Sequence, residues 1–127
     1  MKIYKTQAEV EADIKDGLLK VNDDVKIECN ISINASIICR DLYCWDLDCG
    51  NLNCGDLDCG NLNCEDLKCM DLHCGDLNCG DLECMDLSYY AIAVAYYKFK
   101  CKSVVGRRIN SKHFCLDSEV IITGEGK

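Results

Sequence analysis

The chain of 127 residues contains no proline, only 7% aromatic residues and only two histidines. The absence of proline argues against a proline-rich linker or tail, and a chain of this length is expected to form one domain. No apolar run reaches the length of about 18 residues that a membrane-spanning helix needs, and no secretory leader opens the sequence. We therefore expect a soluble, cytoplasmic protein with no membrane partner.

Signatures of catalysis and of metal binding are also missing. The sequence has no Gly-x-Ser-x-Gly motif and no P-loop, and the paired Cys-x-x-Cys that is typical of zinc sites never occurs. His73 lies among polar residues that vary, and His113 stands near Cys115 without any accompanying pocket motif. We expect no enzyme activity, no catalytic residue, no metal site and no cofactor.

Cysteine, in contrast, is abundant and regularly spaced. Ten of the 13 cysteines fall at every fifth residue from Cys39 to Cys84, and a leucine follows each of them three residues later, from Leu42 to Leu87. The repeating unit, called a pentad below, is Leu-x-Cys-x-[Asp/Asn]. Five residues are enough for one short strand and one corner but too few for a helical repeat. A strict repeat of this length predicts a β-solenoid.

Apolar-x-apolar units extend this pattern on both sides of the pentads. Because side chains alternate along a strand, both apolar residues of a unit should point inward. The additional units are Val25-x-Ile27, Ile31-x-Ile33, Ile37-x-Cys39, Leu87-x-Tyr89, Ile92-x-Val94 and Tyr97-x-Phe99. We expect a solenoid at 25–99, an N-terminal segment at 1–24 and a basic C-terminal cap at 100–127.

The number of sides can be inferred by comparing which residues would stack on one another in coils of different length. A coil of about 20 residues groups the corner residues more evenly by size than a coil of about 15, and it places Asp48 against Lys68, a favourable opposite-charge pair. The expected fold is therefore all-β, a right-handed four-sided parallel β-helix of just under four coils. In such a coil Cys39, Cys59 and Cys79 would be neighbours.

A short helix should precede the solenoid. Thr6 and Glu9 fit a capping box in which Glu9 reaches back to the amide of Thr6, and Val10, Ile14 and Leu18 share one helical face. An open solenoid end exposes core residues and unpaired strand groups. We expect a helix at about 7–16 that caps the N-terminal end.

The cysteines invite three interpretations. An odd number of cysteines without a secretory leader argues against a disulfide framework, and free thiols pack as small apolar side chains. Inward thiols could alternatively form tetrathiolate metal sites, but ionising them among leucines would be costly. We expect reduced, metal-free thiols.

The Asp or Asn before each leucine has a separate explanation. Like charges stacked about 5 Å apart would repel one another. Asp and Asn side chains accept hydrogen bonds from backbone amides at turns, and those bonds favour the ionised carboxylate. We expect these residues to serve turn structure.

Charge is unevenly distributed along the chain, whose net charge is −8. Residues 40–87 are strongly acidic, with only Arg40 and Lys68 as bases, whereas residues 95–115 contain lysine and arginine but no acid. This asymmetry bears on association rather than on fold.

The Asp/Asn-Leu pentads over roughly residues 37–99 resemble those of the pentapeptide-repeat proteins. That resemblance implies a right-handed, four-sided β-helix with leucine at the centre of each unit, although the small inward residue here follows the leucine instead of preceding it. The wider spacing at residues 25–39 also resembles bactofilin-like, polymer-forming β-helices. The sequence is most similar to small bacterial and phage-encoded pentad-repeat proteins that share segments like Tyr89-Tyr90-Ala91 and Gly106-Arg107-Arg108. This likeness implies a fold and no activity.

Two functions remain open. In the first, the protein is a non-enzymatic structural or protein-interaction module that associates with itself. Large side chains at solvent-facing corners form the candidate interface together with the basic segment: Trp45, Met70, Met85, Tyr90, Arg107 and Arg108. In the second, the acidic rod mimics DNA and binds a type II topoisomerase or another nucleic-acid-binding protein, as some pentapeptide-repeat proteins do. Nucleic acid itself is not an expected partner.

Overall fold

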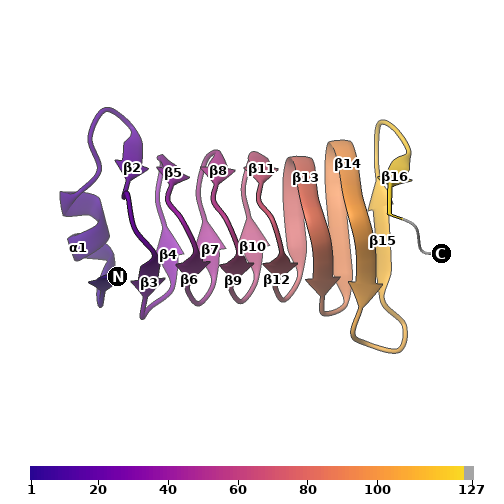
Figure 1. Cartoon of the computed structure of the whole chain (residues 1–127), viewed down its shortest axis with the longest axis horizontal. Coiled ribbons are helices and arrows are strands. Elements are labelled where there is room, and N and C mark those ends of the chain that lie inside the picture. Colours follow the sequence, from indigo (N-terminus) through magenta and orange to yellow (C-terminus); the bar gives the residue numbers. More distant parts are fainter. Residues whose placement is uncertain (125–127) are drawn as a thin grey trace.

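The pentads fold into short parallel strands that wind into a rod (Figure 1). The computed structural model describes residues 1–124. As the alternation predicts, Leu62 and Cys64 are buried while Asn63 between them is exposed. The same pattern holds for nearly every pentad, so one column of leucines and one of cysteines line the inside of each face. The expected all-β parallel solenoid is confirmed.

The strands follow one another in chain order and share one continuous core. Their bounds are β1 Lys2–Tyr4, β2 Leu18–Lys20, β3 Val25–Ile27, β4 Ile31–Ser32, β5 Ser36–Ile38, β6 Leu42–Tyr43, β7 Leu47–Asp48, β8 Leu52–Asn53, β9 Leu57–Asp58, β10 Leu62–Asn63, β11 Asp66–Lys68, β12 Leu72–His73, β13 Leu77–Tyr89, β14 Ile92–Gly106, β15 Lys112–Cys115 and β16 Val120–Ile122.

The predicted four sides are wrong, because the coil is three-sided. Leu42 pairs in register with Leu57, and Leu57 pairs with Leu72. Hydrogen bonds between successive coils accordingly join residues 15 positions apart in the pentad region. Three pentads therefore complete one turn, and the described chain makes about six coils, whereas just under four were predicted for residues 25–99. The right-handed sense of the coil stays a prediction.

The three faces of the rod can be followed by their strands. Face 1 contains β1, β3, β6, β9 and β12; face 2 contains β4, β7, β10 and β15; and face 3 contains β2, β5, β8, β11 and β16. The longer β13 and β14 bend around the corners and contribute to all three faces. From here on, a column is the set of equivalent residues in successive coils, on one face or at one corner.

Corner side chains point into solvent, so their sizes do not indicate the number of sides. Trp45 and Met70 are both more than half exposed, so the sizes of corner residues carry no packing information. The predicted neighbours Asp48 and Lys68 lie on different faces, and Lys68 instead faces Glu83 in register. The thiol columns also change, because residues 15 positions apart become neighbours; Cys39 is therefore followed by Cys54 and not by Cys59.

The N-terminal helix is shorter than predicted. Helix α1 spans Gln7–Ala12, and the Thr6 hydroxyl accepts a hydrogen bond of 3.2 Å from the amide of Glu9. The Glu9 carboxylate reaches the amide of Lys5, and not that of Thr6 as predicted. Helix α1 lies at the N-terminal end of the rod (Figure 1), where Val10 is fully buried.

The C-terminal coils are wider and less regular. The strand register between β13 and β14 shifts after Cys79, opposite the adjacent pair Tyr96 and Tyr97. Tyr89 and Phe99 are buried, as their apolar-x-apolar units predict, but Tyr97 of the unit Tyr97-x-Phe99 is 63% exposed, so its predicted inward position is wrong. The unit Ile92-x-Val94 was assigned to the wrong phase, because the inward residues here are Ala93 and Ala95.

Candidate interaction surfaces

The four predicted corner residues Trp45, Met70, Met85 and Tyr90 lie in two columns of the three-sided coil. A ladder of backbone hydrogen bonds joins Trp45 to Tyr90 through Gly60 and Gly75, so these two aromatic residues lie three coils apart in one column. Met70 and Met85 are direct neighbours in another column, where the Met85 amide donates to the Met70 carbonyl over 2.8 Å. The four side chains are exposed and form no single continuous patch along one corner.

The two arginines of the predicted interface have different surroundings. The Arg107 guanidinium donates hydrogen bonds to the Cys74 carbonyl at 2.6 Å and to the Ser88 hydroxyl at 2.9 Å, so it holds adjacent coils together. The Arg108 guanidinium lies 6.0 Å from the centre of the Tyr90 ring, a cation–π distance. Of the predicted interface residues, Arg108 and Tyr90 are thus brought together, as are Met70 and Met85.

The Asp and Asn side chains form hydrogen-bonded ladders along the rod. The Oδ1 atom of Asp46 accepts a hydrogen bond of 2.8 Å from the amide of Asn61, and Oδ1 of Asn61 accepts one of 2.9 Å from Asp76. The predicted role of these residues as acceptors for backbone amides is therefore confirmed. The amide, however, belongs to the next coil and not to the residue's own turn.

One ladder is built entirely from aspartates. It runs along face 1, is called the aspartate column below, and consists of Asp24, Asp41, Asp56, Asp71 and Asp86. The column on face 2 alternates charged and neutral residues instead, in the order Asn30, Asp46, Asn61 and Asp76. Stacked carboxylates without intervening amides concentrate negative charge on face 1.

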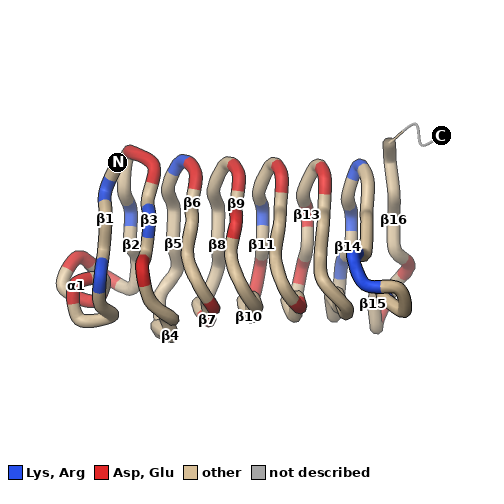
Figure 2. Tube along the Cα trace, turned by 90° about the horizontal axis from the view of Figure 1, so that it is seen from below, with Lys and Arg blue, Asp and Glu red and all other residues tan. Residues whose placement is uncertain are grey.

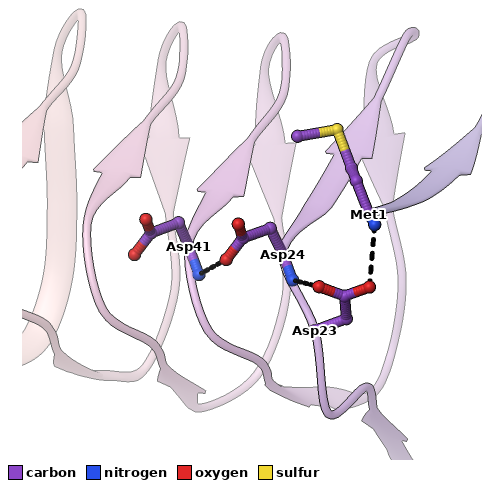
Figure 3. Close-up of polar contacts among 4 residues, drawn as sticks. All are labelled: Met1, Asp23, Asp24 and Asp41. Atoms are coloured by element: carbon purple, nitrogen blue, oxygen red, sulfur yellow. Dashed lines mark hydrogen bonds and ion pairs between the residues drawn. The ribbon is translucent and has the colours of Figure 1, made fainter.

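The pKa values along this column reflect its surroundings. Partial burial and the neighbouring charges of Asp56 and Asp86 raise the pKa of Asp71. At the N-terminal end, Oδ2 of Asp23 lies 2.8 Å from the α-amino group of Met1, while its Oδ1 accepts from the amide of Asp24 (Figure 3). Hydrogen bonding to these two groups lowers the pKa of Asp23.

Three corner glycines, Gly55, Gly60 and Gly75, precede the shortest ladder bonds. A Cβ atom at Gly55 would lie 2.6 Å from Oδ1 of Asp41, the acceptor of that bond. Ladder bonds to Asp or Asn that follow a glycine corner measure 2.8 to 2.9 Å, whereas those after Glu65 and Met70 measure 3.2 and 3.3 Å. The shortest ladder bonds thus follow Gly55, Gly60 and Gly75, whereas after Gly50 the amide of Asn51 donates to the Ser36 hydroxyl over 3.2 Å and after Gly80 the amide of Asp81 donates to the Glu65 carbonyl.

The inward cysteines are free thiols in apolar surroundings. Burial raises the pKa of Cys39, Cys49 and Cys79 to about 12 each, so these thiols are protonated at neutral pH. Within residues 1–124, no group of three or more His, Cys, Asp or Glu side chains has an arrangement suited to holding a metal ion.

The C-terminal end of the rod is a surface that the sequence did not predict. Strands β15 and β16 each pair only with β14 among the described residues, so their other edges are unpaired. Several apolar side chains of the terminal coil, defined as residues 107–124, are strongly exposed: Ile109, Phe114, Leu116, Ile121 and Ile122. In the sequence, the unit Val120-x-Ile122 continues the apolar alternation, and this pattern could have predicted the last coil.

His113 lies inside this terminal coil. It is in register with the inward Ala93, its Nδ1 atom is 3.0 Å from the Tyr89 hydroxyl, and its ring centre lies 5.8 Å from that of Phe99. The sequence had offered only its proximity to Cys115. The structure instead makes His113 part of the partly exposed C-terminal end of the core.

Charge differs between the ends and the body of the rod (Figure 2). Basic residues gather where β14 leads into β15, and acidic residues recur at the corners of the pentad coils. Lys98 forms an ion pair of 3.1 Å with Glu83, which joins the basic segment to the preceding coil.

In comparisons with known proteins, the chain matches no protein-family model, no curated protein and no solved structure. Among residues 1–124, no helix is long and apolar enough to cross a bilayer.

Proposed function

We propose that this protein is a non-enzymatic structural module, a variant pentapeptide-repeat solenoid that associates with a second copy of itself through its terminal coil. The observation that carries this proposal is the difference between the two ends. Strands at both ends pair on one side only among the described residues, but helix α1 lies at the N-terminal end, whereas no helix within residues 1–124 lies against β15 and β16. We assign α1 the role of a cap on this basis.

The physical case rests on edges and apolar surface together. An exposed strand edge is a template for pairing with another chain, and exposed apolar side chains around it add burial energy to that pairing. Ile122 is about half exposed although it is in register with the inward Cys101. The apolar core therefore reaches solvent at the terminal coil. A second terminal coil would cover both the edges and the core.

A two-fold contact is also compatible with the local charges. The terminal coil contains Lys112 on β15, and Asp117 and Glu119 between β15 and β16. In a two-fold interface the same patch is used by both copies, so a base of one copy can face an acid of the other. The basic residues nearby make the contact sensitive to salt.

Sedimentation of the reduced protein at low and high salt tests this function. We expect a dimer that Ile122→Lys converts to a monomer. Ile38→Lys is the matched control, because Ile38 is an exposed isoleucine on the side of the rod, in β5. Circular dichroism should show that both variants keep the fold. A wild-type protein that is monomeric at high concentration in both salts would exclude self-association.

A second candidate function rests on the aspartate column. A row of five carboxylates with one residue per coil is the feature that would serve a DNA mimic, and the partner would be a type II topoisomerase or another nucleic-acid-binding protein. Inhibition of topoisomerase supercoiling by the wild type, lost when Asp41, Asp56 and Asp71 are all changed to Asn, would favour this candidate. The asparagines preserve the ladder acceptors.

A further inference from the structure

Two thiols near the C-terminal end are in direct contact. Cys84 in β13 and Cys101 in β14 are register partners on adjacent parallel strands, and both point into the core. Their Sγ atoms lie 3.1 Å apart. Adjacent strands are about 4.8 Å apart, within the range of about 4.4 to 6.8 Å that disulfides span between Cα atoms. A bond between these sulfurs therefore requires only a small side-chain movement.

This pair differs from the other neighbouring cysteines because it lies at the C-terminal end of its thiol column. Each face has one cysteine column, and in the other two columns the last pentad thiol is followed by a residue without sulfur. Ala95 is in register with Cys79, and Tyr89 occupies the corresponding position after Cys74. The column that ends in Cys84 and Cys101 is thus the one that carries thiol contact into β14.

Access to this pair is provided by the end of the rod. A surface cavity of about 290 Å³ lies beside this pair, and its lining includes Lys100, Lys102, Thr123 and Gly124, but in the closed rod Cys84 and Cys101 are only 7% and 1% exposed. Among residues 1–124, only β16 covers Cys101 on its C-terminal side, with Ile122 in register. Segments with few partners open locally at low free-energy cost, so the β16 segment is where reagents reach the column first.

Sequence neighbours favour Cys101 as the attacking thiol once this segment opens. Lys100 and Lys102 flank it directly, whereas Glu83 precedes Cys84. Nearby ammonium groups stabilise a thiolate, and the thiolate is the reactive form. In the closed rod, the hydrogen bond with Cys84 and then burial raise the pKa of Cys101, so attack requires the open segment.

We propose that Cys84 and Cys101 are a site of oxidative modification, which forms an intramolecular disulfide by exchange with a low-molecular-weight disulfide such as glutathione disulfide. The Cys101 thiolate attacks the reagent, forms a mixed disulfide and releases one glutathione thiolate. The deprotonated Cys84 then attacks the Cys101 sulfur and releases the second glutathione. Two protein thiols are oxidised, and one reagent disulfide is reduced to two thiols.

The product locks the last coils together. The bond closes a loop between residues 17 positions apart and restricts the opened chain, so the oxidised protein should melt at a higher temperature than the reduced one. A reductant should reverse the change. This inference does not depend on the proposed self-association, because the bond lies within one chain.

Peptide mapping of the full-length protein tests the proposal. The reduced protein is incubated with excess glutathione disulfide, its remaining thiols are alkylated, and it is cleaved after lysine and after Glu83. Cleavage after Lys100 and Lys102 releases Cys101 in a dipeptide, and cleavage after Glu83 separates Cys84 from the earlier cysteines. We expect the dipeptide to be recovered linked to the fragment that begins at Cys84, with a loss of two hydrogens.

Variants sharpen this test. Cys84→Ala and Cys101→Ala should each abolish the cross-link, whereas Cys79→Ala, the matched control in another column, should retain it. Recovery of Cys101 linked to a different cysteine, or of alkylated Cys101 after treatment, would overturn the proposal. The wild-type map decides the question even if a variant fails to fold.

Discussion

The amide of Asp56 donates a hydrogen bond of 2.9 Å to Oδ1 of Asp41, the residue one coil earlier in the aspartate column. The same side-chain-to-backbone contact recurs along all three faces, with serine as the acceptor at the start of one of them. Each contact satisfies a backbone donor at a corner, where the strand ladders are interrupted. The repeat therefore stabilises its corners with residues that lie outside the apolar core.

The buried leucine columns should dominate stability. We expect Leu62→Asp to lower the free energy of unfolding by at least about 4 kcal/mol, because it buries a carboxylate without a partner. Asn63→Asp adds the same charge to the adjacent outward position, in register with Asp48, and should cost only about 0.5 kcal/mol. Urea unfolding followed by circular dichroism measures both. A Leu62→Asp protein that keeps the wild-type thermal midpoint would contradict the inward register.

The aspartate column should limit stability at neutral pH. Asp71→Asn retains the acceptor oxygen and removes repulsion from Asp56 and Asp86, so it should stabilise the protein by about 0.5 kcal/mol, a small gain because the site is exposed to solvent. The reverse change, Asn61→Asp on face 2, should destabilise it by a similar amount, because it inserts a charge between Asp46 and Asp76.

The pH dependence of the Asp71→Asn effect follows from the direction in which the pKa of Asp71 is shifted. The pKa of Asp71 is raised in the folded protein, so folding favours its protonated form. The penalty of the ionised carboxylate is therefore absent below the unfolded pKa of about 3.9 and fully present above the raised folded value. The difference between variant and wild type should vanish as the pH falls to about 3. An equal difference at pH 3 and pH 7 would show that charge is not the cause.

The close approach at corner glycines can be tested at Gly55. Gly55→Ala places a Cβ 2.6 Å from Oδ1 of Asp41, so the ladder bond to Asp56 must lengthen, at a cost of about 1 kcal/mol. At Gly50 the nearest atom to an added Cβ is the Ala35 carbonyl oxygen at 3.2 Å, so Gly50→Ala should cost less. Thermal unfolding of the two variants makes the comparison. Equal losses would remove the special role of the ladder oxygen.

The thiols should be reduced but slow to react in the folded protein. Burial raises the pKa of Cys39 and Cys49 to about 12, so little thiolate is present at pH 8. A thiol-specific reagent should modify few cysteines in the native state and nearly all 13 after denaturation without reductant. Zinc that stays bound in stoichiometric amount through dialysis would contradict the expectation of metal-free thiols.

The two possible self-association surfaces can be separated with Trp45. Trp45 lies in the pentad region, away from the terminal coil, so Trp45→Glu should leave a dimer formed by the terminal coil intact. Higher salt should weaken that dimer, because basic residues of the segment 98–112 lie close to it. A monomeric Trp45→Glu protein, together with a wild-type dimer that salt does not affect, would instead locate the interface at the corner columns, as the sequence predicted.

Much of this fold could be predicted from local patterns. The alternation of Leu and Cys is a property of single strands, so the inward and outward positions of residues such as Leu62 and Asn63 are evident without knowing the coil. The acceptor role of the Asp and Asn side chains follows equally from their chemistry. Trp45 and Met70 were also correctly expected at exposed corners.

The tertiary structure decided how these strands close. Whether Leu42 lies against Leu57 depends on the interior volume that six inward side chains per coil fill and on the hydrogen bonds between coils. A five-residue repeat is compatible with three or four sides, and the exposed corner residues that were used to choose between them pack against little. The way the coils close also determined which thiols touch. Cys84 meets Cys101 because the coil between them spans 17 residues, whereas a pentad coil spans 15.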